Sequence, residues 1–288
     1  DSIRDLAEER TVTQGYNFTN VRKDRKGSKR PMPWNIENFS LTYAFNQQKT
    51  KTPFILNQTL DQYKGAIDYQ YATGLKPFQP FKKLIKKDKY LKFITEFNFN
   101  PIPNTYGFST NMERLRDVTT WRFAGEDPKN NTYYNRRLTW DRNYDLGWDI
   151  MKSLRFNFDA TMRALVDEPT EYKDDGNGPR YTQQERKDIL WQNVKKLGRP
   201  KNYNHTASIN YTLPFKVIPM MDWVNVKASY TAGYTWTAQS LKLQNLDAGQ
   251  YQERTTARNL GNVIQNNSVR QINGDLDFTK LYDKSKYL

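Results

Sequence analysis

The chain has 288 residues, and 45 Lys and Arg against 31 Asp and Glu give it a formal net charge of +14. It has no cysteine and one histidine, which excludes disulfide scaffolds and thiol chemistry and argues against most zinc and Ser-His chemistry. Aromatic residues make up 14% of the chain, more than a disordered polypeptide carries, so these large side chains need an apolar environment.

Apolar and polar residues alternate through most of the chain, which predicts β-strands. The first strand is weakly marked by Val12, Tyr16 and Phe18, and about ten strands are expected in total. In chain order, the later strands are expected at 38–46, 63–71, 93–99, 106–112, 138–148, 154–166, 207–213, 224–236 and 272–278. No apolar run is long enough for a transmembrane helix.

The expected connections alternate between long and short. Short ones fall near 48–57, 100–104, 149–153 and 214–221, and long ones near 21–35, 73–90, 116–131, 167–202 and 239–260. Antiparallel up-and-down strands with short turns at one end and long loops at the other are typical of outer-membrane β-barrels. A β-sandwich would show alternation within its strands but Greek-key connections. We therefore predict an all-β fold in which residues 1–288 form a segment of one transmembrane β-barrel domain, with the long loops extracellular.

The two phases of the strands predict two environments, because a barrel strand turns one face to lipid and the other to a watery lumen. The residues expected to face lipid are Phe39, Leu41, Tyr43, Leu154, Phe156, Phe158, Tyr230, Tyr234 and Trp236. The residues expected to face the lumen are Asp141, Asp145, Arg155, Asp159, Arg163 and Lys227.

The long loop 167–202 carries the signature of a helix at 182–197. Thr182 and Glu185 have the spacing of a capping box, apolar residues recur along one helical face, and Gly198 stands where a C′ glycine is expected. We expect this helix to rest on the mouth of the barrel.

No catalytic, cofactor or metal site is predicted, and the chain is not expected to be an enzyme. His205 is more readily explained as a solvent-facing or interfacial residue than as a catalytic one. Asp141, Asp145 and Asp149 share one phase of a strand, but Asp145 and Asp149 would lie about 13 Å apart, too far for paired acid–base work. They are expected to line the lumen.

The basic segment 81–89 has two interpretations. Its lysines could form an anion site for nucleic acid or for anionic headgroups, or they could simply be a solvated loop. A soluble nucleic-acid-binding β protein would explain the charge, but it would leave the alternation and the connection lengths unexplained.

Nine phrases between residues 16 and 276 resemble the SprA/Sov family, the outer-membrane translocon of the type IX secretion system in Bacteroidota. They are YNFTNVRK at 16–23, PWNIENFS at 33–40, FNFNPIP at 97–103, DRNYDLGWD at 141–149, GRPKNYN at 198–204, NYTLP at 210–214, DWVNV at 222–226, GNVIQN at 261–266 and NGDL at 273–276.

The resemblance implies that the chain is an internal stretch of a very large single-chain barrel in the cell outer membrane. Such a barrel exports folded cargo proteins, is linked to gliding motility, and works with a PorV-like barrel at a lateral gate and a periplasmic plug protein. Outer-membrane lipid and lipopolysaccharide are the other expected contacts, and neither a cofactor nor nucleic acid is expected. The alternatives are another outer-membrane barrel, such as a porin or transporter, and a soluble nucleic-acid-binding β protein.

Overall fold

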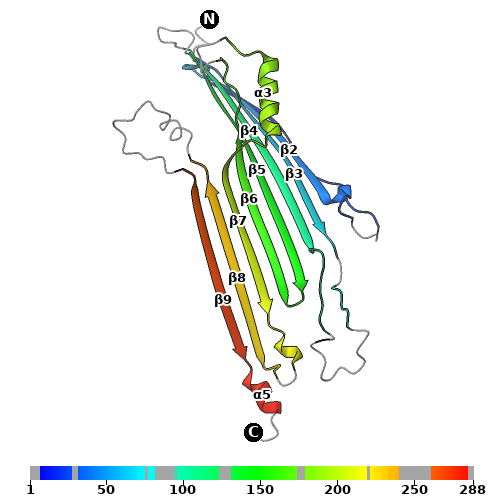
Figure 1. Ribbon diagram of the computed structural model, residues 1–288. Coiled ribbons are helices and arrows are strands. Elements are labelled where there is room, and N and C mark those ends of the chain that lie inside the picture. The colour runs from blue at the N-terminus through cyan, green and yellow to red at the C-terminus, as the bar shows by residue number, and fades with distance from the viewer. Residues whose placement is uncertain are drawn as a thin grey trace, which may run out of the picture.

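The computed structural model describes residues 7–27, 32–74, 77–81, 94, 96–122, 131–173, 179–218, 221–239 and 261–284. Nine strands form one antiparallel sheet in which every strand pairs with its neighbours in sequence (Figure 1). The strands are β1 (Arg10–Val21), β2 (Phe39–Lys51), β3 (Ile55–Ala72), β4 (Thr105–Trp121), β5 (Thr132–Met151), β6 (Leu154–Val166), β7 (Arg199–Thr212), β8 (Val224–Thr237) and β9 (Val263–Leu276). The predicted all-β, up-and-down antiparallel fold is confirmed.

The helical elements are few and lie outside the sheet. Helix α3 (Gln183–Lys195) lies beside one end of the sheet, and α5 (Phe278–Lys284) lies at the opposite end (Figure 1). Two 3-10 turns, η1 (Ile36–Asn38) and η4 (Phe215–Val217), precede β2 and β8. The two ends of the sheet are called the α3 end and the α5 end below.

The prediction of a strand at 93–99 is wrong. Phe97 and Phe99 are described and lie outside the sheet, while Phe93 and Thr95 lie outside the described residues. Phe99 makes only an isolated bridge to Phe78, with both N–O distances at 2.9 Å. The prolines at 101 and 103 follow at once, and they lack the N–H that a ladder would need.

Because one strand is missing, the predicted separation of long from short connections is also wrong. The α3 end carries the connections 52–54, 122–131, 167–198 and 238–262, and the α5 end carries 22–38, 73–104, 152–153 and 213–223. Both ends therefore have long connections, and loop length no longer indicates which end would be extracellular.

The register gathers the apolar phase of every strand on one side of the sheet. A single cross-strand row contains Phe39, Tyr69, Phe108 and Tyr144, and ring centroids lie 4.9 Å apart for Phe39–Tyr69 and 5.3 Å apart for Phe108–Tyr144. We call this side the apolar face and the other side the polar face. Away from the β-bulges, the apolar face holds the even-numbered residues of β1, β4, β5, β6, β8 and β9 and the odd-numbered residues of β2, β3 and β7.

The sheet is a single layer with almost no core. Among the described residues, the buried apolar side chains are Leu138, Ala160, Ala164 and Val166, and no large side chain is fully buried. On the apolar face of β2, Leu41 is 51% exposed and Tyr43 is 45% exposed. A water-soluble domain of this size would bury such residues under a second layer. The apolar face therefore requires a partner or an apolar solvent.

The helix predicted at 182–197 is confirmed as α3, with small differences at its end. Thr182 is the N-cap, and its side chain and that of Glu185 form both hydrogen bonds of a capping box. The helix ends in a Schellman motif, since Leu197 N–H donates to the Val194 carbonyl and Gly198 N–H donates to the Asn193 carbonyl. Leu197, with φ 64°, thus holds the C′ position expected for Gly198, which follows with φ 68°.

The two positive φ values predict opposite effects of substitution. Gly198→Ala is expected to destabilise the α3 loop by about 1–2 kcal/mol, because φ is +68° and a Cβ would lie 2.9 Å from the Leu165 carbonyl oxygen. Leu197→Gly is expected to stabilise it by about 1 kcal/mol, since it relieves the same backbone strain at an exposed side chain. Hydrogen exchange of the α3 amides measures both. If Leu197→Gly also weakened protection, backbone strain would not be the controlling factor.

Candidate functional site

The polar face brings together all six residues predicted to line a lumen. Asp141, Asp145, Arg155, Asp159 and Arg163 lie on β5 and β6, and Lys227 lies on the same face of β8. The Arg163 guanidinium donates to both carboxylate oxygens of Asp141, from Nε at 2.9 Å and from Nη2 at 3.2 Å. Their neighbours on this face are mostly Asn, Ser and Thr.

The three aspartates of β5 face three different partners. Asp141 is held by Arg163, and Asp149 forms an ion pair with Arg155. Asp145 stands directly opposite Asp159 in the register, and its carboxylate occupies the space beside Gly107 that a Cβ would fill. The result is a row of mixed charge, most of it paired across strands, along one polar surface.

The apolar face brings together the nine residues predicted to face lipid, on β2, β6 and β8. His205 lies among them. Its ring stacks on Tyr234 with centroids 5.2 Å apart and lies 5.6 Å from Phe158, and its Nδ1 has no hydrogen-bond partner among the described residues. The imidazole is therefore part of an aromatic cluster on the apolar face, in the same cross-strand row as Ala160 and Tyr144. Its interpretation as a solvent-facing or interfacial residue stays a prediction.

The loop between β6 and β7 folds back onto the apolar face at the α3 end. Arg142 of β5 donates from Nη2 to the Leu197 carbonyl at 3.1 Å. Beneath the loop lie Leu138, Ala164 and Val166, which are apolar-face residues and make up most of the small core. Helix α3 thus lies against the sheet, whereas the sequence analysis expected it to rest on the mouth of a barrel.

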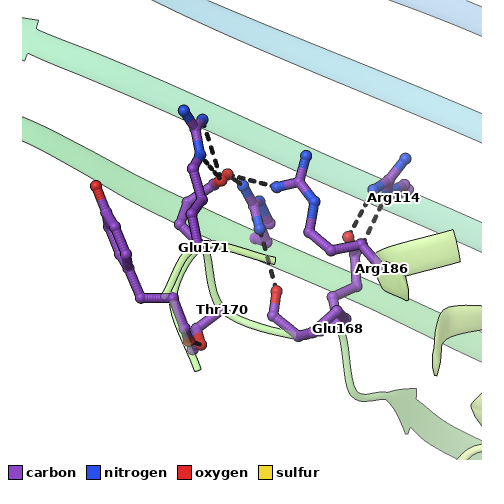
Figure 2. Close-up of polar contacts among 9 residues, drawn as sticks. Arg114, Glu168, Thr170, Glu171 and Arg186 are labelled. Atoms are coloured by element: carbon purple, nitrogen blue, oxygen red, sulfur yellow. Dashed lines mark hydrogen bonds and ion pairs between the residues drawn. The ribbon is translucent and has the colours of Figure 1, made fainter. Parts of the chain in front are cut away.

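Six charged residues hold this loop in place, and we call them the loop clasp: Arg114, Arg136, Glu168, Glu171, Arg180 and Arg186. Arg114 donates to both Glu168 carboxylate oxygens at 2.8 and 2.6 Å. Arg186 donates to Glu171 at 2.6 Å, as Figure 2 shows. Arg136 also pairs with Glu171 and donates to the Pro169 carbonyl at 3.1 Å.

The loop clasp was not predicted from the sequence, although the chain contains a signal for it. Arg114 lies in the same phase of β4 as Met112, and Arg136 lies in the same phase of β5 as Leu138 and Trp140. Cations in an otherwise apolar phase need a partner close by. Here the partners are the two glutamates of the loop, which only the folded chain brings within reach.

At the α5 end, residues 96–104 form a second group of tertiary contacts, with the turn between β5 and β6. The Asn100 side-chain amide donates to the Asp149 carbonyl at 2.7 Å, and Asn98 Oδ1 accepts from Lys152 N–H at 2.7 Å. Trp148 Nε1 donates to the Asn100 carbonyl at 2.9 Å. These bonds explain why two asparagines are buried in a segment predicted to be partly strand.

The carboxylates of the α3 loop have lowered pKa values, which predicts that acid destabilises the loop. Hydrogen bonds from Lys173 and from Thr182 lower the pKa of Glu185 to about 2. Burial alone would raise the pKa of Glu171, but hydrogen bonds and charges from Arg136 and Arg186 outweigh burial and lower it. A hydrogen bond from Arg199 likewise lowers the pKa of Asp167.

A lowered folded-state pKa contributes stability that is complete above the unfolded value and is lost as pH falls through the folded value. We therefore expect the loop to stay protected from pH 7 to about 5 and to loosen between roughly pH 4 and 2. Hydrogen exchange of the α3 amides, corrected for the intrinsic effect of pH, measures this. Loosening that is already complete at pH 5 would contradict it.

The basic segment at 81–89 remains a prediction, since residues 82–90 lie outside the described part of the chain. Within the described ranges, no group of three or more His, Asp or Glu side chains is arranged to hold a metal ion. A search of the same ranges finds no helix with the length and hydropathy of a membrane span. The sequence matches no protein-family model and no curated protein.

Proposed function

We propose that this chain forms part of the wall of a protein-conducting outer-membrane β-barrel, the translocon of the type IX secretion system that its phrases resemble. The observation that carries the proposal is the division of the sheet. Nine consecutive antiparallel strands place their apolar phases on one face and their polar phases on the other. Between the α3 loop at one end and residues 96–104 at the other, no second layer covers the apolar face in the described residues.

The dimensions of the apolar face suit a bilayer. Trp140 and Trp148 lie eight residues apart on the apolar face of β5. At a rise of about 3.3 Å per residue they span roughly 26 Å, close to the apolar band of an outer-membrane barrel. The tryptophans would then stand at the two interfaces, where aromatic girdles are found.

The two edge strands of the sheet are an argument that this chain is part of a larger sheet. Among the described strands, β1 pairs only with β2, and β9 pairs only with β8. An exposed edge of this length is a template for further pairing, and only closure into a barrel removes both edges. We expect further strands to continue the sheet beyond β1 and β9.

The polar face suits the passage of folded proteins better than the binding of one small solute. Short Asn, Ser and Thr side chains line it on β7 and β8, and Asp141 and Asp149 on β5 are paired with arginines of β6. A solvated surface of mixed charge offers cargo no apolar patch to adhere to. In this proposal secreted cargo meets the polar face, while a PorV-like barrel, a plug protein, lipid and lipopolysaccharide are the other contacts.

Fractionation of the native full-length protein is the first test. We expect it in detergent extracts of outer membranes, in a complex with a smaller barrel or a plug protein. A photocrosslinker at Asn157 on the polar face is expected to trap secreted cargo, and one at Phe158 on the apolar face is not. Recovery from the outer membrane without cargo crosslinks would favour a porin or transporter. A soluble protein with salt-sensitive binding to single-stranded DNA would overturn the membrane assignment.

A further inference from the structure

A basic cavity lies between the apolar face of the sheet and the α3 loop. Its volume is about 330 Å³, and five of its nine lining residues are cations, with Glu168 as the one lining carboxylate. The cations are Arg114 and Arg116 of β4, Arg136 of β5, and Arg186 and Lys187 of α3. Two strands and a helix thus place positive charge around one partly open cavity, beside the contacts drawn in Figure 2.

The carboxylates of the loop clasp compensate only part of this charge. Glu168 pairs with Arg114, and Glu171 pairs with Arg136 and Arg186. Arg116 and Lys187 form no ion pair with any residue in the described part of the chain. Asp61, opposite Arg116 in the register, accepts from Gln47 Nε2 at 2.7 Å instead. Two cations therefore remain available to an anionic ligand.

The cavity also lies at a particular depth, an argument that rests on the proposed membrane function. On the apolar face of β4, Met112 is the last apolar residue before Arg114 and Arg116. At about 3.3 Å per residue these arginines lie roughly 7 and 13 Å beyond Met112 along a tilted strand. The headgroup region adds about 5–8 Å on each side of the hydrocarbon. The cavity therefore meets the layer in which lipid phosphates lie.

We propose that this cavity binds the phosphate of a lipid headgroup, with Arg116 and Lys187 as its principal ligands. An Arg guanidinium presents a planar fork that matches two phosphate oxygens, and Lys adds a compact point charge. A phosphate monoester carries about −1.5 to −2 charges, which matches the two uncompensated cations. A bound headgroup would then join β4 to α3 and fix the loop at the membrane surface.

Calorimetric titration of the detergent-extracted full-length protein tests the proposal. The probes are short-chain phosphatidic acid, phosphatidylcholine of the same chain length, and inorganic phosphate. Phosphatidic acid is expected to bind most tightly. The double variant Arg116→Gln with Lys187→Gln is expected to weaken that binding by a factor on the order of ten or more. The matched double variant Lys195→Gln with Lys196→Gln removes the same charge from the far end of the α3 loop and should stay within about twofold.

Each other outcome is decisive. Equal weakening by the two double variants would mean that net charge, and no site, attracts the ligand. Inorganic phosphate binding as tightly as phosphatidic acid would overturn the lipid assignment in favour of free phosphate. Phosphatidylcholine has a phosphodiester in a net-neutral headgroup, so its binding equally well would overturn the match between the two cations and a phosphate monoester. Loss of the proposed membrane function would be seen separately, as a soluble protein on fractionation.

Discussion

Replacing Phe158 with Arg is expected to cost the protein about 2–4 kcal/mol in assembly into the membrane, the penalty for a cation on the lipid face near mid-bilayer. Phe158 lies on the apolar face of β6, opposite Leu146 of β5 and Ala207 of β7. No carboxylate stands beside it in these rows to pair with a guanidinium. The readout is the fraction of full-length protein that reaches the outer membrane and shows heat-resistant migration.

Asn157→Arg is the matched control, because the neighbouring residue points to the opposite face. Asn157 stands between Gly147 and Ser208, and its side-chain amide donates to Ser208 Oγ at 3.4 Å. A long cation there can extend into water, so a change within about 0.5 kcal/mol is expected. Equal losses for the two variants would contradict the assignment of the apolar face to lipid, and with it the proposed function.

The strands themselves were predictable from the sequence because their signal is local. The period-two pattern predicted β6 at Leu154–Val166 with the observed bounds, and the capping box at Thr182 located α3. The same pattern assigned every predicted lipid or lumen residue to its phase. Antiparallel pairing then carries those phases to a common face, since opposite residues point the same way.

The errors arose where structure depends on contacts between distant parts of the chain. Residues 93–99 alternate like a strand, yet Phe99 finds only Phe78 as a partner and joins no ladder. A single lost strand reverses the direction of all later strands, so it invalidated the argument from loop length. The loop clasp likewise depends on Glu171 returning to Arg136, 35 residues away, which no local pattern specifies.

Removing the Glu171 carboxylate is expected to release the α3 loop from the sheet. In the Arg136–Glu171 pair the side chains are only 10% and 4% exposed, so Glu171→Ala would leave Arg136 unpaired in a largely buried position. Breaking one side of such a pair costs about 3–5 kcal/mol. Hydrogen exchange of the α3 amides is expected to rise by at least about two orders of magnitude, while the strand amides away from the loop keep their protection.

Two further variants separate charge from packing. Asp188→Asn changes an exposed site on α3 where, within the described part of the chain, the side chain accepts a hydrogen bond only from Gln184, so it is expected to leave exchange unchanged. Glu171→Gln with Arg136→Met removes both charges while keeping their volumes, and it is expected to recover much of the lost protection, because the cost lies in the unpaired cation. If Glu171→Ala left α3 protected, the small apolar core under the loop would hold it instead, and the clasp would be dispensable.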